Sequence, residues 1–97
     1  MVKHIIIWTL KEENNTLVVK NGIKQGLESL QGVIPGLLEI KVEINPIPSS
    51  NGDVMLYSVF ENGDALKGYA VHPEHVKVVD TFVRPFTATR ACFDYEV

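Results

Sequence analysis

The chain has 97 residues, a formal net charge of -3 and a single cysteine, Cys92. This length predicts one domain, residues 1–97, with a small core, and one cysteine excludes an intrachain disulfide or a cysteine-rich zinc site. The acidic balance with scattered basic residues argues against nucleic acid, and the absence of a long apolar run argues against a membrane span, so we expect a cytoplasmic protein.

The first half of the chain predicts a strand, a helix and a second strand. Val2–Leu10 is rich in isoleucine on both faces, which favours a strand covered on both sides. Residues 14–16 can cap a helix whose apolar positions recur every three or four residues, and Pro35-Gly36 ends it. Its expected buried positions are Val19, Ile23, Leu27, Leu30 and Ile34. Apolar residues then alternate as in a half-buried strand: Leu38, Ile40, Val42 and Ile44.

The second half predicts a strand, a broken helix and a final strand. Val54–Phe60 is the third strand, and Asn62-Gly63-Asp64 opens a short helix. His72 should end this helix because a residue before proline avoids the α conformation, and Pro73 should start the next one. We expect the buried stripe of that helix to be Val76, Val79, Phe82 and Val83 and the last strand to be Thr87–Tyr95.

The resulting order, β-α-β-β-α-β, is that of an α+β ferredoxin-like subunit with a four-stranded antiparallel sheet. Both helices then cover one face of the sheet, and Gly22 and Gly26 should allow the first helix to pack closely on it. The other face would expose apolar side chains, namely Ile5, Ile7, Val59 and Phe93. We therefore expect a homodimer formed by sheet-to-sheet packing.

Candidate catalytic residues come from both ends of the chain and from the segment Tyr69–His75. In this topology the first and last strands are antiparallel neighbours, which places His4 opposite Asp94. An imidazole oriented by a carboxylate is a common arrangement for a general base, and Tyr69 and His75 can complete a proton-transfer site. The same register pairs Ile6 with Cys92 and Trp8 with Arg90, and with Leu56 these are the candidate substrate-binding residues: Ile6, Trp8, Leu56, Arg90 and Cys92.

Each candidate has a structural alternative. His4 and Tyr69 can be core residues with satisfied hydrogen bonds. His72 is better explained as a helix-breaking or capping residue, and a metal held by His72 and His75 is disfavoured because the helix breaks between them. Arg90 can stack on Trp8, the favoured role, or receive an anionic group of a ligand. No metal or cofactor is expected.

The chain resembles the stress-responsive A/B barrel (Dabb) family over nearly its whole length. The residues that carry the resemblance are Val2-Lys3-His4-Ile5, Ile34-Pro35-Gly36, Asp53-Val54-Met55-Leu56, Ala65-Leu66, His72-Pro73-Glu74-His75 and Phe93-Asp94-Tyr95. The resemblance implies a dimeric α+β barrel. One activity in this family, that of olivetolic acid cyclase, is an intramolecular aldol condensation without a cofactor, and its motif residues match His4, Tyr69, His75 and Asp94.

Two departures from that cyclase affect the expected substrate. By the resemblance, Trp8 and Arg90 occupy positions where that cyclase has aliphatic residues, which implies a smaller and more polar cavity. The sequence thus favours a cofactor-free proton-transfer or aldol-type enzyme on a small, anionic carbonyl compound. A non-catalytic, stress-responsive dimeric protein is the alternative, and a cofactor-independent monooxygenase, suggested by fold analogy alone, is less favoured.

Overall fold

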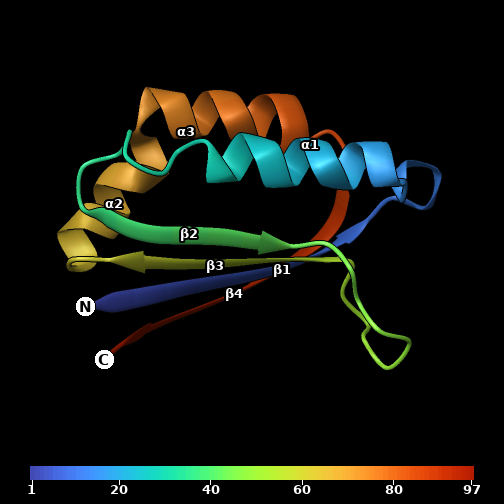
Figure 1. Cartoon of the computed structure of the whole chain (residues 1–97), viewed down its shortest axis with the longest axis horizontal. Coiled ribbons are helices and arrows are strands. Elements are labelled where there is room, and N and C mark those ends of the chain that lie inside the picture. The colour runs from blue at the N-terminus through green and yellow to red at the C-terminus, as the bar shows by residue number, and fades with distance from the viewer.

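The computed structural model describes residues 1–97 and has one layer of helices over one face of a four-stranded antiparallel sheet (Figure 1). The strands are β1 (Val2–Leu10), β2 (Leu37–Glu43), β3 (Val54–Phe60) and β4 (Thr87–Glu96). The helices are α1 (Leu17–Glu28), α2 (Gly63–Val71) and α3 (Pro73–Val78), with a short 3₁₀ turn η1 (Glu12–Asn14) and a π-helical turn η2 (Val79–Val83). The strand order β2-β3-β1-β4 confirms the ferredoxin-like arrangement.

The register of β1 with β4 agrees with the sequence prediction. His4 pairs with Asp94, Ile6 with Cys92 and Trp8 with Arg90. From His4 to Leu10, the even-numbered side chains of β1 are buried beneath the helices, since side chains alternate between the two faces of a strand. This face of the sheet therefore forms both the core and the floor of the candidate site.

Helix α1 begins where predicted but ends earlier. The Thr16 side chain accepts a hydrogen bond from the Val19 amide at 3.3 Å, which caps the helix. The helix ends at Glu28, and the chain then turns through Gly32, whose φ of +81° no helix accommodates. The prediction of a helix reaching Ile34 was wrong, although Leu30 and Ile34 are buried as expected.

Strand β2 departs from strict alternation at its start. A register shift between Leu37 and Glu39 turns Leu37 into the core and leaves Leu38 44% exposed. The prediction that Leu38 faces the core was therefore wrong. The prediction that Val59 is exposed to solvent was also wrong. Val59 is buried between its cross-strand partners Lys3 and Glu39, whose long side chains flank it.

The second helical segment breaks as predicted. His72 adopts an extended conformation, and its Nδ1 accepts a hydrogen bond from the Glu74 amide at 3.1 Å, which caps α3. The predicted stripe of this segment is only partly correct, since Val83 is buried but Val76 and Phe82 are exposed.

The small residues of α1 face the other helical segment and not the sheet. A Cβ added at Gly26 would lie 2.9 Å from the Phe82 ring, and one at Gly22 would lie 3.3 Å from it. Phe82 therefore packs its ring on α1 while its outer edge stays exposed. The expectation that these glycines serve helix-to-sheet packing was wrong.

The face of the sheet opposite the helices is uncovered in the single chain (Figure 1). Ile7 is 45% exposed and Phe93 is 69% exposed, while Ile5 is partly buried. No helix of the chain is long and apolar enough to cross a membrane.

Candidate active site

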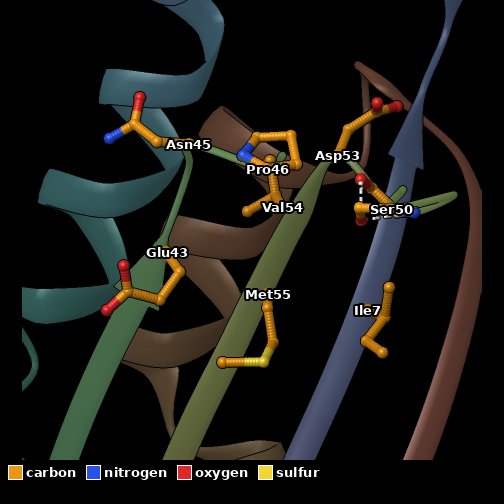
Figure 2. Close-up of a pocket in the computed structure, with 9 residues that line it drawn as sticks. Ile7, Glu43, Asn45, Pro46, Ser50, Asp53, Val54 and Met55 are labelled. Carbon is orange, nitrogen blue, oxygen red and sulfur yellow. Dashed lines mark hydrogen bonds between the residues drawn. The ribbon is translucent and has the colours of Figure 1, made fainter. Parts of the chain in front are cut away.

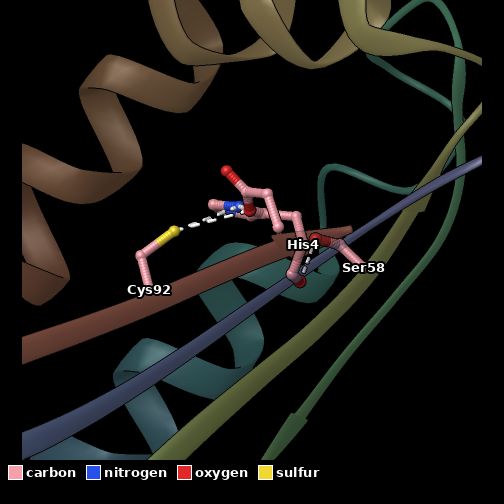
Figure 3. A network of polar contacts seen from close by, with 4 residues as sticks. His4, Ser58 and Cys92 are labelled. Carbon is pink, nitrogen blue, oxygen red and sulfur yellow. Dashed lines mark hydrogen bonds and ion pairs between the residues drawn. The ribbon is translucent and has the colours of Figure 1, made fainter. Parts of the chain in front are cut away.

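The first element of the site is the pair formed by His4 and Asp94 across β1 and β4. His4 Nδ1 and Asp94 Oδ1 form a short hydrogen bond. Because an ionised carboxylate oxygen only accepts, Nδ1 carries the proton and Nε2 is left free as an acceptor. On the other side, Ser58 Oγ donates to the His4 carbonyl oxygen at 3.0 Å and fixes the backbone of β1 at this residue (Figure 3).

Tyr69, near the end of α2, is the second element. Its ring packs edge-on against Phe60 and His4, with ring centroids 4.9 and 6.1 Å away. The side chain is 1% exposed, and its hydroxyl is buried without any hydrogen-bond partner. Burial raises the pKa of Tyr69 far above its ordinary value, and the positive charge of Arg90 offsets this only in part. The hydroxyl therefore stays protonated and is a hydrogen-bond donor without an acceptor.

His75, in the first turns of α3, is the third element. Its ring lies over the Tyr69 ring with centroids 3.9 Å apart and planes inclined by 35°. Its Nδ1 lies 3.4 Å from the Ala70 carbonyl oxygen, which can only accept, so this contact keeps the proton on Nδ1. Burial lowers the pKa of His75; the hydrogen bond to the Ala70 carbonyl offsets this in part, and His4, Arg84 and His72 lower the pKa slightly further. The imidazole is thus neutral near pH 7, with Nε2 as a basic nitrogen.

These three side chains line one pocket of about 400 Å³ between the sheet and the helices. Trp8 forms part of its wall without filling it, and Ile6, Leu56 and Arg90 line it as expected from the sequence. Cys92 and Asp94 do not line it; they lie beside His4 on β4. The lining residues that sequence reasoning missed are Leu27, Ala70, Val79, Val83, Arg84 and Thr87.

Of these missed residues, Arg84 matters most for chemistry. Arg84 directly follows the buried Val83 at the end of η2 and lies shortly before β4. This position was the sequence feature that could have placed Arg84 near the pocket. Arg84 and Arg90 give the pocket two guanidinium groups and no carboxylate among its lining residues, in a chain with net charge -3. Arg84 pairs with Asp80 at 3.2 Å, whereas Arg90 has no ion pair.

The favoured structural role of Arg90 was wrong. Arg90 does not stack on Trp8, since the one cation–π contact of the chain places Lys3 over the Tyr57 ring at 5.4 Å. The guanidinium of Arg90 is therefore available to an anionic group entering the pocket.

A second, smaller hollow of about 170 Å³ lies on the opposite face, beneath the loop that follows β2 (Figure 2). Two of its polar side chains are engaged within the chain. Asp53 Oδ2 accepts from the Leu10 amide at 2.8 Å, and the Ser50 hydroxyl donates to the Gly52 carbonyl at 2.9 Å. This hollow holds the loop against β1 and gathers no histidine or tyrosine.

Comparison with known proteins places the chain in a family. The model of the stress-responsive A/B barrel domain, Dabb, matches residues 2–97. The chain belongs to this family. No curated protein matches the sequence. The resemblance to the Dabb family seen in the sequence is thereby confirmed.

Solved structures agree with the Dabb assignment. A dimeric protein of unknown function with a ferredoxin-like fold from Bacteroides fragilis NCTC 9343 shares 38% identity at a TM-score of 0.89, covering 99% of this chain and 95% of that one. Hydroxynitrile lyase from Passiflora edulis has 17% identity and a TM-score of 0.81, with coverage of 97% and 90%. An antibiotic biosynthesis monooxygenase has 13% identity and a TM-score of 0.77, with coverage of 100% and 98%. The last two likenesses concern the fold alone.

Proposed function

We propose that this Dabb protein is a cofactor-free enzyme that moves protons on a small carbonyl compound in a reaction of aldol type. The observation that carries the proposal is the convergence of His4, Tyr69 and His75 on one pocket of about 400 Å³, a volume suited to a small organic molecule. Convergent groups with perturbed protonation in a concave site are the usual sign of acid and base chemistry.

His75 is the general base in this proposal. Its Nδ1 is engaged by the Ala70 carbonyl, so Nε2 is the acceptor, and burial lowers its pKa so that it is unprotonated near neutral pH. A base with a pKa near or below the working pH can accept a proton in most of the enzyme molecules.

Tyr69 donates a hydrogen bond to the carbonyl oxygen of the substrate. Its hydroxyl is buried without a partner, and burial keeps it protonated. A preorganised donor of this kind stabilises the negative charge that develops on oxygen, and it needs no reorganisation during the reaction.

The proposed reaction balances with these groups alone. His75 Nε2 takes a proton from the carbon next to the carbonyl, and the electron pair moves to oxygen, which Tyr69 stabilises as an enolate. The enolate carbon attacks a second carbonyl, and the resulting alkoxide takes the proton back from the His75 imidazolium. His4 Nε2, left as an acceptor by the hydrogen bond of Nδ1 to Asp94, assists by accepting a hydrogen bond from the hydroxyl that this step forms.

Arg90 selects the substrate class. Its guanidinium has no ion pair, and no carboxylate lines the pocket. A carboxylate on the substrate would therefore find a charge-assisted partner at the pocket wall. Trp8 limits the room, which favours a small substrate over a long-chain polyketide.

We also propose that the protein is a homodimer joined through the uncovered face of the sheet. The support is the exposure of Ile7 and Phe93 on that face and the dimeric state of the Bacteroides fragilis relative. Phe93→Glu should convert the dimer to a monomer in size-exclusion chromatography with light scattering. The free thiol of Cys92 suits the reducing environment of the cytoplasm, where we place the protein.

The alternative is a non-catalytic, stress-responsive dimeric protein that binds a ligand in the same pocket. The contact of His75 favours it, because the one hydrogen bond of this imidazole goes to a backbone carbonyl, as for a structural histidine. A cofactor-independent monooxygenase has weaker support, since the similarity to a monooxygenase concerns the fold alone.

Hydrogen–deuterium exchange distinguishes these functions. The probes are 4-oxopentanoate and its neutral analogue pentan-2-one, and NMR follows the exchange of the protons beside the carbonyl in D₂O. We expect the wild type to accelerate exchange, with 4-oxopentanoate faster than pentan-2-one, and His75→Gln to abolish the effect. Arg90→Gln should remove the preference for the anion. Exchange equal in wild type and His75→Gln would favour the non-catalytic alternative.

A further inference from the structure

We infer that His4, Cys92 and Asp94 form a binding site for one divalent zinc-type metal ion at the edge of the sheet. The inference does not depend on the proposed function, because it rests on the positions of three side chains and not on any proton transfer. The three residues each offer one ligand atom, and these atoms all lie within 4.8 Å of one another.

Strand register brings the three ligands together. Asp94 is the direct cross-strand partner of His4, and Cys92 is two residues earlier on the same face of β4. Figure 3 shows the Cys92 sulfur and the His4 ring facing each other on the helix-covered side of the sheet. Two neighbouring strands fix these positions, and side chains on strands are held more precisely than side chains on loops.

The spacing of the ligand atoms fits a tetrahedral ion. With metal–ligand bonds of roughly 2.0–2.3 Å, the edges of a tetrahedron around zinc are roughly 3.3–3.7 Å long. Cys92 Sγ lies 3.8 Å from His4 Nδ1 and 3.4 Å from Asp94 Oδ1. The Cys92–Asp94 edge is thus within this range and the Cys92–His4 edge is close to it, so the main change required is that the hydrogen-bonded edge between His4 and Asp94 opens. The Asp94 side chain is 42% exposed, so it has room to rotate.

The donor set also fits the charge of the ion. A thiolate and a carboxylate neutralise a dication, and a neutral imidazole completes a set of sulfur, oxygen and nitrogen donors that suits zinc or cobalt better than magnesium or calcium. Three protein ligands leave a fourth position for water or a small ligand. Arg90 is the one cation near the thiol, and its guanidinium is exposed to solvent, which screens the repulsion.

Binding must release the thiol proton. Burial raises the pKa of Cys92, and the hydrogen bond and negative charge of Asp94 raise it further, whereas Arg90 lowers it. Metal coordination replaces this proton, and the His4 proton moves from Nδ1 to Nε2 without leaving the ring. The charged and titratable groups that face the thiol are His4 on β1 and Asp94 and Arg90 on β4. Each bound ion thus displaces the thiol proton, so binding is favoured at higher pH.

Metal binding and the His4–Asp94 pair are alternative uses of the same nitrogen. An ion on Nδ1 takes that nitrogen away from Asp94 and reverses the tautomer of the ring. A bound metal ion would therefore inhibit any reaction that needs the hydrogen-bonded pair.

The test is titration of the full-length, metal-free, reduced protein with Co²⁺, followed by displacement with Zn²⁺. We expect one Co²⁺ per chain, a sulfur-to-cobalt charge-transfer band in the near ultraviolet, visible bands of tetrahedral intensity, and loss of all bands on addition of Zn²⁺. Cys92→Ser should remove the charge-transfer band, and Asp94→Asn should weaken binding by more than about 100-fold, because even residues that only support metal ligands contribute 10–100-fold.

Glu96→Gln is the matched control for Asp94→Asn. It removes an acidic group from the same face of β4, two residues beyond Asp94 and outside the cluster, so the bands and affinity should be unchanged. Absence of the charge-transfer band in the wild type, equal affinity in Asp94→Asn and wild type, or one ion shared by two chains would each overturn the inference. Cys92→Ser keeps the His4–Asp94 pair, so its deuterium exchange reports on the proposed function separately.

Discussion

Removing the Tyr69 hydroxyl should stabilise this protein while it removes the proposed hydrogen bond to the substrate. Tyr69 is 1% exposed, and its hydroxyl finds no partner in the folded chain. A polar group buried without a hydrogen bond costs about 1–3 kcal/mol relative to its hydrated state in the unfolded chain. Phenylalanine has no such cost, so Tyr69→Phe recovers it.

The change also removes one packed oxygen atom. A void of roughly 15 Å³ at about 24 cal/mol per Å³ costs about 0.4 kcal/mol. The net expectation is a gain of about 1–2 kcal/mol in the free energy of unfolding, which corresponds to a rise of at least about 4 °C in Tm for a domain of this size. Tyr95→Phe is the control. Because Tyr95 lies beside Phe93 on the face proposed for the dimer, both variants are compared in the Phe93→Glu monomer, where the Tyr95 side chain is 38% exposed and the change should alter stability by less than about 0.5 kcal/mol.

Urea denaturation at a fixed protein concentration measures both variants, since dimerisation makes apparent stability depend on concentration. The same Tyr69→Phe protein should lose most of its deuterium exchange on 4-oxopentanoate. A decrease of more than about 1 kcal/mol in its unfolding free energy would show that the hydroxyl has a structural partner, and the proposed role of Tyr69 as an unoccupied donor would fail.

Three further expectations concern stability. Gly36→Ala should lower the free energy of unfolding in urea by at least about 2 kcal/mol, because φ is +80° and the new Cβ would lie 2.5 Å from Ala65 Cβ. The control Gly32→Ala, with φ of +81° and open space around the new Cβ, should lower it by only about 1 kcal/mol. Equal losses in the two variants would refute the contact with Ala65. Leu27→Ala, at a fully buried position of α1, should cost about 2–5 kcal/mol, and a loss below about 1 kcal/mol would place Leu27 outside the core. Burial lowers the pKa of His75 below its ordinary 6.5, so the imidazole binds a proton more readily in the unfolded chain than in the folded one. The free energy of unfolding should therefore fall as the pH drops through about 6.5 and level off below the folded pKa. His75→Gln should lack this pH-dependent loss of stability.

The parts of the fold that depend on local patterns could be predicted from the sequence. The isoleucine-rich run located β1 and the two-faced pattern of the last residues located β4. The split βαβ order then predicted their pairing, so the opposition of His4 and Asp94 followed from topology. His72 could be assigned as a cap because the effect of Pro73 on the preceding residue is local.

The errors arose where contacts distant in sequence decide the structure. The register shift at Leu38 and the burial of Val59 depend on neighbouring strands, and Gly26 packs on Phe82 because two helices meet above the sheet. Periodicity within one segment contains no information about these partners.

In the candidate site, too, the residues could be predicted from the sequence, but the properties that determine their chemistry could not. The sequence pointed to Tyr69 and His75, but their usefulness depends on burial, which only packing determines. The same burial raises the pKa of Tyr69 and lowers that of His75, so in this stacked pair the donor stays protonated and the acceptor stays neutral over a wider pH range than in the free side chains. Two titratable groups whose pKa values are moved apart in one pocket are how acid and base roles are assigned in enzymes. A free Tyr is already protonated and a free His is mostly neutral at pH 7, so burial does not create these two roles but widens the pH range over which both hold, as expected for a catalytic pair.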